Sequence, residues 1–375
     1  MILNKKIIFV TGTRADWGKL KSLVTKSSAK NFDVHVFITG MHNDPKYGST
    51  YHDVQTVNNV KFYRFDNKTD ESTMDLTVAK TIGGFSKYVE KINPDLIIVH
   101  GDRPEPLACA IVGSFKNILV AHIEGGEVSG TIDELIRHSI TKLSHIHFVS
   151  NKKARERLIQ MGEDKNSIFI IGSPDVDLMF SKELPSLKDS KEWYNINFQD
   201  YSICLFHPVT TEIDVLESQV HCLIESLIES EKKYVVIYPN NDLGSKLIIE
   251  NYRKIKSPKI KFFSSMRFEF FLTILKHSNF IIGNSSAGIR EAPYYSLHSI
   301  NIGSRQNKRD QNPLINNVGF DKKQILNSIN NLSKVNGQKP IKNYGDGNSS
   351  EQFINILQLE SFWKIKNQKI FNDIK

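Results

Sequence analysis

The residues from 99 to 145 hold most of the charged side chains that could do chemistry. This stretch reads VHGDRPEPLACAIVGSFKNILVAHIEGGEVSGTIDELIRHSITKLSH, and its charged groups follow apolar runs or begin helical ones. Carboxylates and arginines at strand ends are how an α/β fold builds a site for a charged substrate. We therefore predict a site for a charged substrate that includes the carboxylates Asp102, Glu124 and Asp133.

Each of these carboxylates has a structural alternative. Asp102 and Arg103 end an apolar run, and they could simply pair and cap the next helix, although such groups are rarely buried unpaired. Asp133 falls in the first turn of a helix predicted to start near residue 132, where the helix dipole stabilises an anion. An exposed pair with Arg137, four residues on, is its alternative, worth only ~0.3–0.5 kcal/mol.

The first loop of the chain is suited to phosphate. The string TGTRADWGKL, residues 11–20, follows an apolar run and leads into a helix. A loop of this kind exposes backbone N–H groups and the positive end of a helix dipole. Arg14 and Lys19 could hold a diphosphate there, although the string is neither a Walker loop nor the dinucleotide fingerprint. A plain strand-to-helix turn is the alternative.

A second set of polar residues follows apolar runs in the other half of the chain. His207 ends such a run in FHPVTTE, and GNSSAGIREAP predicts a strand, a small-residue loop and a helix start. Ser285 and Ser286 would add hydroxyls to the amides of that helix start, which makes a second phosphate site. Glu291 would lie one to two turns inside the helix and accept both ribose hydroxyls, and Arg305 would neutralise the diphosphate.

The pattern of elements predicts an α/β fold with two Rossmann-like, doubly wound domains facing a cleft. Apolar runs are continuous, as in parallel sheets that are covered on both faces, and helical stretches around 71–92, 104–116 and 132–144 lie between them. The expected strands are 7–12, 34–40, 62–65, 96–101, 118–124, 146–150, 168–173, 202–207, 234–240, 260–265, 280–286 and 299–303.

Chain length also favours two domains, because single cores rarely grow past about 250–300 residues and this chain has 375. We expect an N-terminal domain over 1–173 with the catalytic carboxylates and a polar, proline-containing linker over 174–200. We also expect a second Rossmann-like domain over 201–350 that binds a nucleotide, and a C-terminal helix over 351–375 that packs back on the first domain. The arrangement resembles the GT-B fold of many nucleotide-sugar enzymes.

Composition excludes several classes of protein. The net charge is +8, but the lysines are scattered, so we expect a basic site for a small phosphorylated ligand and no nucleic acid. Cys109, Cys204 and Cys222 lack metal-ligand spacing and are typical of reduced thiols in a cytosolic protein. No apolar run is long enough for a membrane span or a signal peptide, so we expect a cytoplasmic protein.

Long strings of the chain closely resemble the hydrolysing UDP-N-acetylglucosamine 2-epimerases of the bacterial sialic acid pathway. The resemblance assigns Arg14 to the diphosphate, Asp16 to the sugar or the catalytic step, and His42 to the sugar pocket. It also places Phe268 near the uracil, with a core phenylalanine as the alternative. The matching strings are TGTRADWGKL, HGDR, HIEGGEVSGTID, FHPVTTE, YPNND, GNSSAGIREAP, GSRQ and YGDGN.

The resemblance implies hydrolysis of UDP-N-acetylglucosamine with inversion at carbon 2, giving UDP and N-acetylmannosamine. Elimination would form 2-acetamidoglucal, and water addition at carbon 1 would return a proton to the opposite face of carbon 2. Two different acid/base groups are therefore needed. The candidates are Asp102, Glu124 and Asp133, with His207 assisting, and which face each serves stays open. We expect no metal, no nicotinamide or other cofactor, and a homodimer or homotetramer.

Three alternatives stay open. A hydrolysing epimerase of UDP-N,N'-diacetylbacillosamine often has His in place of Glu124 and Glu in place of Asp16. Non-hydrolysing epimerases typically carry Thr in place of Arg103, so the arginine favours the hydrolysing branch. The last alternative is a GT-B glycosyltransferase or a nucleotide-sugar-binding protein without turnover, and the many carboxylates of the first domain disfavour simple binding.

Overall fold

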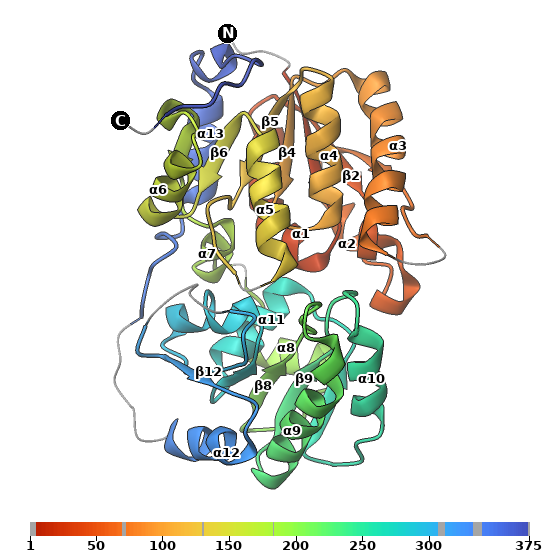
Figure 1. Cartoon of the computed structure of the whole chain (residues 1–375), viewed down its shortest axis with the longest axis vertical. Coiled ribbons are helices and arrows are strands. Elements are labelled where there is room, and N and C mark those ends of the chain that lie inside the picture. Colours follow the sequence, from red (N-terminus) through yellow and green to blue (C-terminus); the bar gives the residue numbers. More distant parts are fainter. Residues whose placement is uncertain are drawn as a thin grey trace. The chain divides into compact units, whose positions relative to one another are not determined.

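The chain folds into two compact α/β units, shown in the computed structural model in Figure 1. Unit 1 comprises Met1–Glu127, Asp133–Ser181 and Tyr344–Lys375, and unit 2 comprises Val128–Ile132 and Lys182–Asn343. The structure describes residues 5–69, 73–129, 131–182, 184–306, 312–332 and 340–373. Each unit has its own parallel sheet, which confirms the predicted fold class of two Rossmann-like domains.

Unit 1 contains a seven-stranded sheet in which all pairs are parallel, in the order β3-β2-β1-β4-β5-β6-β7. The order reverses between β1 and β4, and ligands of such sheets bind outside the carboxyl ends of the strands at this point. Its strands are β1 (Lys6–Thr11), β2 (Asp33–Ile38), β3 (Lys61–Arg64), β4 (Leu96–His100), β5 (Leu119–Ile123), β6 (Ile146–Val149) and β7 (Ile168–Ile170).

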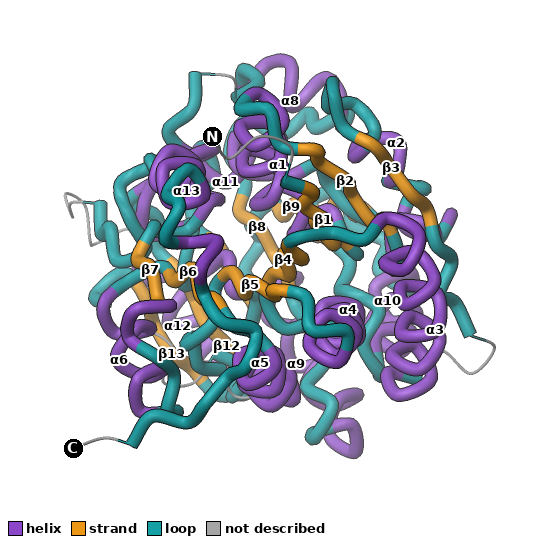
Figure 2. The backbone as a smooth tube through the Cα atoms, turned by 90° about the horizontal axis from the view of Figure 1, so that it is seen from above, coloured by secondary structure: helices purple, strands orange, loops and turns teal. Residues whose placement is uncertain are grey.

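Helices cover both faces of this sheet, which Figure 2 shows from above. The side chains of Ile7 and Phe9 in β1 belong to the hydrophobic core that includes residues of α1 and α13. Helices α3 and α4 pack against each other. The strands are apolar along their whole length because both faces of the sheet are buried. The helices of unit 1 are α1 (Arg14–Ala29), α2 (Tyr51–Val54), α3 (Met74–Ile92), α4 (Pro104–Phe115), α5 (Ile132–Leu143), α6 (Lys152–Gln160), α7 (Pro174–Met179) and α13 (Ser349–Leu357).

Unit 2 repeats the design with a six-stranded parallel sheet in the order β10-β9-β8-β11-β12-β13, so its reversal lies between β8 and β11. Its strands are β8 (Ser202–Leu205), β9 (Tyr234–Ile237), β10 (Ile260–Phe263), β11 (Ile281–Gly283), β12 (Ser299–Ile302) and β13 (Ile315–Val318). Its helices are α8 (Leu187–Trp193), α9 (Leu216–Glu229), α10 (Ser245–Arg253), α11 (Phe268–Lys276) and α12 (Lys322–Asn331).

Most of the expected elements agree with these bounds to within a few residues, and the differences are as follows. The helix predicted over 71–92 starts at Met74, and residues 71 and 72 lie outside the described ones. The segment 174–200, predicted as a linker, contains α7 and α8, because Pro174 takes the first position of α7, where a helix tolerates proline. Strand β13 was not predicted.

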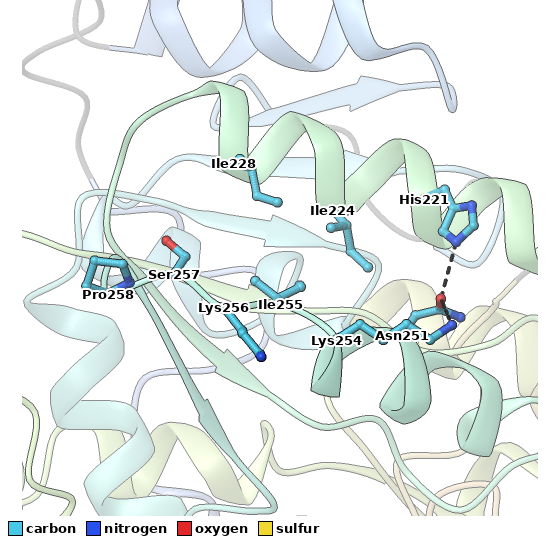
Figure 3. Close-up of a pocket in the computed structure, with 9 residues that line it drawn as sticks. All are labelled: His221, Ile224, Ile228, Asn251, Lys254, Ile255, Lys256, Ser257 and Pro258. Carbon is cyan, nitrogen blue, oxygen red and sulfur yellow. Dashed lines mark hydrogen bonds between the residues drawn. The ribbon is translucent and has the colours of Figure 1, made fainter.

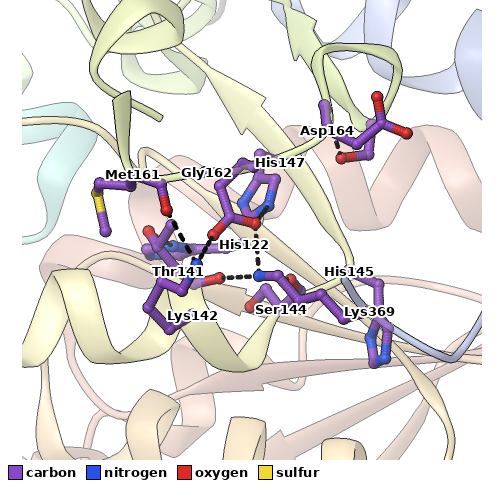
Figure 4. Close-up of polar contacts among 12 residues, drawn as sticks. His122, Thr141, Lys142, Ser144, His145, His147, Met161, Gly162, Asp164 and Lys369 are labelled. Carbon is purple, nitrogen blue, oxygen red and sulfur yellow. Dashed lines mark hydrogen bonds and ion pairs between the residues drawn. The ribbon is translucent and has the colours of Figure 1, made fainter. Parts of the chain in front are cut away.

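The C-terminal segment differs from the expected single helix over 351–375. Helix α13 ends at Leu357 and packs against α1, and a short 3-10 turn at Phe362–Lys364 precedes an extended stretch. This stretch is held by polar contacts, and one is from His145 Nε2, which donates to the carbonyl of Asn367 at 2.9 Å. In a second set, Lys369 Nζ donates to the carbonyls of Thr141 and Ser144 (Figure 4). The end of unit 1 is therefore tied to α5 and β6.

Candidate active site

The loop after β1 is organised around the carboxylate of Asp16. Asp16 accepts hydrogen bonds from the Thr11 hydroxyl at 2.9 Å, the Gly12 amide at 2.9 Å, and the Thr13 amide and hydroxyl at 2.8 and 3.0 Å. Thr13 in turn accepts from the Asp16 amide, which completes a capping box at the start of α1. Asp16 therefore shapes the loop that carries Arg14.

His42, at the end of β2, joins the same network. Its Nε2 lies 3.0 Å from the Thr11 hydroxyl and its Nδ1 lies 2.6 Å from the Thr50 hydroxyl. Burial lowers the pKa of His42 to about 4, so the ring is neutral at physiological pH. Arg14 lies beside it and makes an ion pair with Asp53 at 2.9 Å. The two loops at the ends of β1 and β2 are thus joined.

Glu124, which follows β5, is the centre of a buried cluster. Its Oε2 accepts from Lys19 Nζ at 3.1 Å and lies 3.1 Å from His100 Nε2, and its Oε1 accepts from the Ser173 hydroxyl. Lys19 Nζ also lies 3.2 Å from Asp175 Oδ2. Lys19, predicted as a diphosphate contact, is therefore shared between two carboxylates inside unit 1.

The backbone of Glu124 is in an unusual conformation. Its φ of 65° lies in the left-handed region, which costs about 1–3 kcal/mol for a residue with a side chain and occurs mainly at functional sites. Gly126 follows with a φ of 77°, and a Cβ there would meet the carbonyl oxygen of Ala154 at 2.3 Å. The glycine is therefore required for this turn, and the turn directs the Glu124 carboxylate toward Lys19.

Asp102, which follows β4, pairs with Arg137 of α5. The Nη2 atom of Arg137 donates to Asp102 Oδ2, and its Nη1 atom donates to the carbonyl of Glu127 at 3.2 Å. Burial lowers the pKa of the Arg137 guanidinium, but Asp102 more than offsets this, so that the pKa is raised. Arg103 is the residue before α4, and Asp133 lies in the first turn of α5. The Arg103 side chain makes no capping hydrogen bond to α4, and Asp102 pairs with Arg137.

In unit 2, His207 follows β8, next to the switch point. Asn284 joins it to the end of β11: the His207 amide donates to Asn284 Oδ1 at 2.7 Å, and Asn284 Nδ2 donates to the His207 carbonyl at 2.8 Å. The amide of Asn240 donates to His207 Nδ1 at 3.2 Å. A neutral ring therefore carries its proton on Nε2.

The loop after β11 differs from the expected helix start. Gly283 has a φ of 134°, and a Cβ there would lie 2.2 Å from the Leu205 carbonyl oxygen, so this position requires glycine. Beyond it, Ser286 begins a three-residue 3-10 turn, capped by the Ser285 side chain. Glu291 is buried and precedes another short turn, so it does not lie inside a helix. Sequence patterns overestimated this helix because its small residues fit either structure.

The remaining predicted residues of unit 2 lie around the same strand ends. Arg305 follows β12, and its Nη1 donates to the Asn284 carbonyl at 3.3 Å, so it is joined to the loop of Ser285. Phe268 is the first residue of α11, is 9% exposed and stacks on Phe271 with ring centroids 6.3 Å apart. These contacts show Phe268 packed in the core of unit 2, and its place near the uracil stays a prediction.

The predicted residues therefore form two groups, one at the carboxyl ends of each sheet. Sequence reasoning missed three members of the Glu124 cluster: His100, Ser173 and Asp175. Asp175 was placed in a linker, but it lies in the first turn of α7, directly after Pro174. A proline followed by acidic residues, which is typical of the first turn of a helix, was the signal that could have found this helix.

A pocket of about 450 Å³ lies elsewhere in unit 2. It is formed by α9, through Ile224 and Ile228, and by the segment of Lys254 and Lys256 that leads into β10 (Figure 3). Because this segment enters β10, the pocket lies at the amino end of that strand, away from the carboxyl ends that carry His207 and Ser285. We do not assign it to the candidate active site.

Among the residues that the structure describes, no group of three or more His, Cys, Asp or Glu side chains could hold a metal ion. In the same part of the chain, no helix has the length and apolar character needed to cross a membrane.

Solved structures with the same architecture come from several organisms. The UDP-GlcNAc 2-epimerase of Methanocaldococcus jannaschii, in complex with UDP-GlcNAc and UDP, has a TM-score of 0.81 and 22% identity, covering 94% of this chain and 99% of that one. A UDP-GlcNAc 2-epimerase from Neisseria meningitidis bound to UDP-GlcNAc has a TM-score of 0.79 and 17% identity over the same shares. Because these identities are low, the structural similarity establishes the fold alone.

Several other relatives share a higher sequence identity with this chain. A UDP-N-acetylglucosamine 2-epimerase of Neisseria meningitidis serogroup B is 42% identical over 99% of both chains. A hydrolyzing UDP-N,N'-diacetylbacillosamine 2-epimerase of Legionella pneumophila is 34% identical over 94% of this chain and 96% of its own length. The polysialic acid biosynthesis protein P7 of Escherichia coli is 31% identical over 99% and 93%. The family model for UDP-N-acetylglucosamine 2-epimerase matches residues 25–358, and the chain therefore belongs to that family.

Proposed function

We propose that this protein is a hydrolysing UDP-N-acetylglucosamine 2-epimerase that supplies N-acetylmannosamine for sialic acid synthesis. The observation that carries the proposal is the pair of carboxylates on neighbouring strands, Asp102 after β4 and Glu124 after β5, each with its own cation. An elimination followed by a hydration needs two acid/base groups with different environments. Arg103, where non-hydrolysing relatives typically carry Thr, supports the hydrolysing branch.

In the proposed reaction, unit 1 supplies the acid/base groups and unit 2 the groups that bind UDP. A carboxylate takes the proton from sugar carbon 2 while the bond from carbon 1 to the UDP oxygen breaks. The electron pair of the C–H bond then forms the double bond of 2-acetamidoglucal, and cations stabilise the departing diphosphate. Water adds at carbon 1, and an acid returns a proton to the opposite face of carbon 2.

The names of the relatives support this pathway and one alternative. Polysialic acid biosynthesis, in the name of the Escherichia coli relative, requires a sialic acid precursor. The Legionella relative, named a hydrolyzing diacetylbacillosamine 2-epimerase, favours that sugar nucleotide as the second candidate substrate. Glu124 and Asp16 stand where that branch often has His and Glu, so UDP-N-acetylglucosamine remains the first candidate.

A proton spectrum of the reaction in D₂O tests the proposal. The protein should convert UDP-N-acetylglucosamine to UDP and the α-anomer of N-acetylmannosamine with deuterium at carbon 2, because solvent supplies the returning proton. The α-anomer is expected because water adds on the face that UDP left. Protium at carbon 2 would exclude the elimination. UDP-N-acetylmannosamine as product would indicate the non-hydrolysing branch, and turnover of only the diacetylbacillosamine nucleotide would make the alternative substrate correct. UDP release that needs a sugar acceptor would indicate a transferase.

A further inference from the structure

The Lys19 ammonium lies between two buried carboxylates. Its Nζ is 3.1 Å from Glu124 Oε2 and 3.2 Å from Asp175 Oδ2. Lys19 is 9% exposed, Glu124 5% and Asp175 1%, so all three are shielded from water. Buried charges of this kind persist only when they are paired, and their electrostatic coupling is stronger than at a surface. Removing any one of them must change the protonation of the others.

The other groups around Glu124 come from neighbouring elements. His100, at the end of β4, places Nε2 3.1 Å from Glu124 Oε2, and the Ser173 hydroxyl donates to Oε1. The charged groups of the adjoining strand ends have partners of their own. Arg137 of α5 pairs with Asp102, and the Ser150 hydroxyl donates to Glu127 at 2.5 Å. Lys19, Asp175 and His100 therefore all lie close enough to contribute to the charge balance at Glu124.

The charges of this cluster explain what Asp175 does. Lys19 carries one positive charge, and Glu124 and Asp175 each carry one negative charge when ionised. The Asp175 charge offsets part of the attraction between Lys19 and Glu124 and adds negative charge nearby, and both effects favour a proton on Glu124. Without the Asp175 charge, Lys19 would stabilise the ionised form of Glu124 more strongly. Asp175 therefore makes Glu124 a better proton acceptor.

We propose that Asp175 is a positioning residue for the reaction, which divides the Lys19 ammonium between two carboxylates and so keeps Glu124 able to take the proton from sugar carbon 2. The inference rests on the proposed function, in which Glu124 is an acid/base group. Asp175 itself acts through Lys19 and need not touch the substrate. In this proposal Lys19 interacts with the base, Glu124, and not with the diphosphate.

The pH dependence of kcat/KM for UDP release tests this role. Asp175→Asn has the same shape without the charge, and it should move the acid limb about one unit lower and reduce the plateau about tenfold. Lys19→Gln removes the opposite charge and should move the limb to higher pH. Asp175→Glu keeps the charge and should restore the limb. A purely structural role would lower the rate at every pH without moving the limb.

A titration that needs no turnover keeps the inference separate from the proposed function. In protein labelled with ¹³C at glutamate side chains, the Glu124 signal is the one lost in Glu124→Gln. Its midpoint should fall in Asp175→Asn and rise in Lys19→Gln. An unmoved midpoint in both folded variants overturns the inference. A wild-type protein that leaves UDP-N-acetylglucosamine unchanged overturns the proposed function, and the carboxyl titration still decides the role of Asp175.

Asp177 offers a matched control on the same helix. Its carboxylate accepts from the amides of Ser349 and Ser350 at 2.8 and 2.7 Å, outside the Glu124 cluster. Asp177→Asn also removes one negative charge from α7, and it should lower the melting temperature while the acid limb and the Glu124 midpoint stay in place. A limb that moves equally in Asp177→Asn would reduce the Asp175 effect to general electrostatics and refute the proposal.

Discussion

Glu163→Gln should destabilise unit 1 in a pH-dependent way. The Glu163 side chain is buried between β6, α5 and the C-terminal segment, where it accepts from Lys142 at 2.8 Å and His147 at 3.0 Å. Lys369 is the third donor, at 2.5 Å. Gln cannot satisfy three donors with one amide oxygen, and it removes the negative charge that pairs with both ammonium groups. The C-terminal segment should therefore be held less tightly.

The magnitude follows from the pKa of Glu163. Burial raises this pKa, but His147, Lys369 and Lys142 lower it more, from 4.5 to about 2. At about 1.4 kcal/mol per unit, and with a discount because Lys142 is partly exposed, the carboxylate contributes about 2–3 kcal/mol. Because the folded pKa is the lower one, this stabilisation is complete above pH 4.5 and is lost as the pH falls toward 2.

Urea unfolding at two pH values measures this effect. At pH 7 the free energy of unfolding of Glu163→Gln should be about 2–3 kcal/mol below that of the wild type, and at pH 3 the difference should shrink to less than half. Glu156→Gln is the control, because Glu156 is an exposed glutamate on α6. An equal loss at both pH values, or an equal loss in the control, would refute the reasoning.

Three further predictions concern activity and binding. Asp102→Asn and Glu124→Gln should each lower kcat by ~10²–10⁴-fold with an unchanged circular dichroism spectrum, and more than about a tenth of the wild-type rate in either would exclude an acid/base role for that residue. Arg305→Ala and Ser285→Ala should weaken UDP binding in calorimetric titration, and unchanged affinity in both would place the nucleotide site elsewhere. Activity should survive chelation with EDTA, and a loss that a divalent ion restores would contradict this.

The elements that sequence predicted best are those whose local pattern is unambiguous. Strands β1, β4 and β5 are continuous apolar runs, as expected for a sheet that is buried on both faces. Strand β13 reads INNV, with two asparagines in its middle, and its residues are partly exposed at the edge of the sheet. Such a strand forms because β12 offers a partner, and a local pattern cannot indicate that.

For the site, the sequence indicated positions but not partnerships. Charged residues after apolar runs were expected near the ends of parallel strands, and Asp102, Glu124, His42 and His207 lie there. The pairing of Lys19 with Asp175 depends on how α7 packs against α1, which no local pattern contains. For this reason Lys19, which the sequence indicated as a phosphate ligand, is found paired with two carboxylates in the structure.

The cations that accompany the two carboxylates suggest how their roles divide. Asp102 is paired with Arg137, whose guanidinium stays charged at any physiological pH, so Asp102 should remain ionised. Glu124 instead shares a lysine with a second carboxylate, and proton uptake there relieves an excess of negative charge. Because neighbouring carboxylates divide acid/base work when their environments differ, Glu124 is the one expected to change protonation during the first step. Asp102 would stay ionised in this step, and the assignment predicts that Asp102→Asn lowers kcat but leaves in place the pH limb that belongs to Glu124.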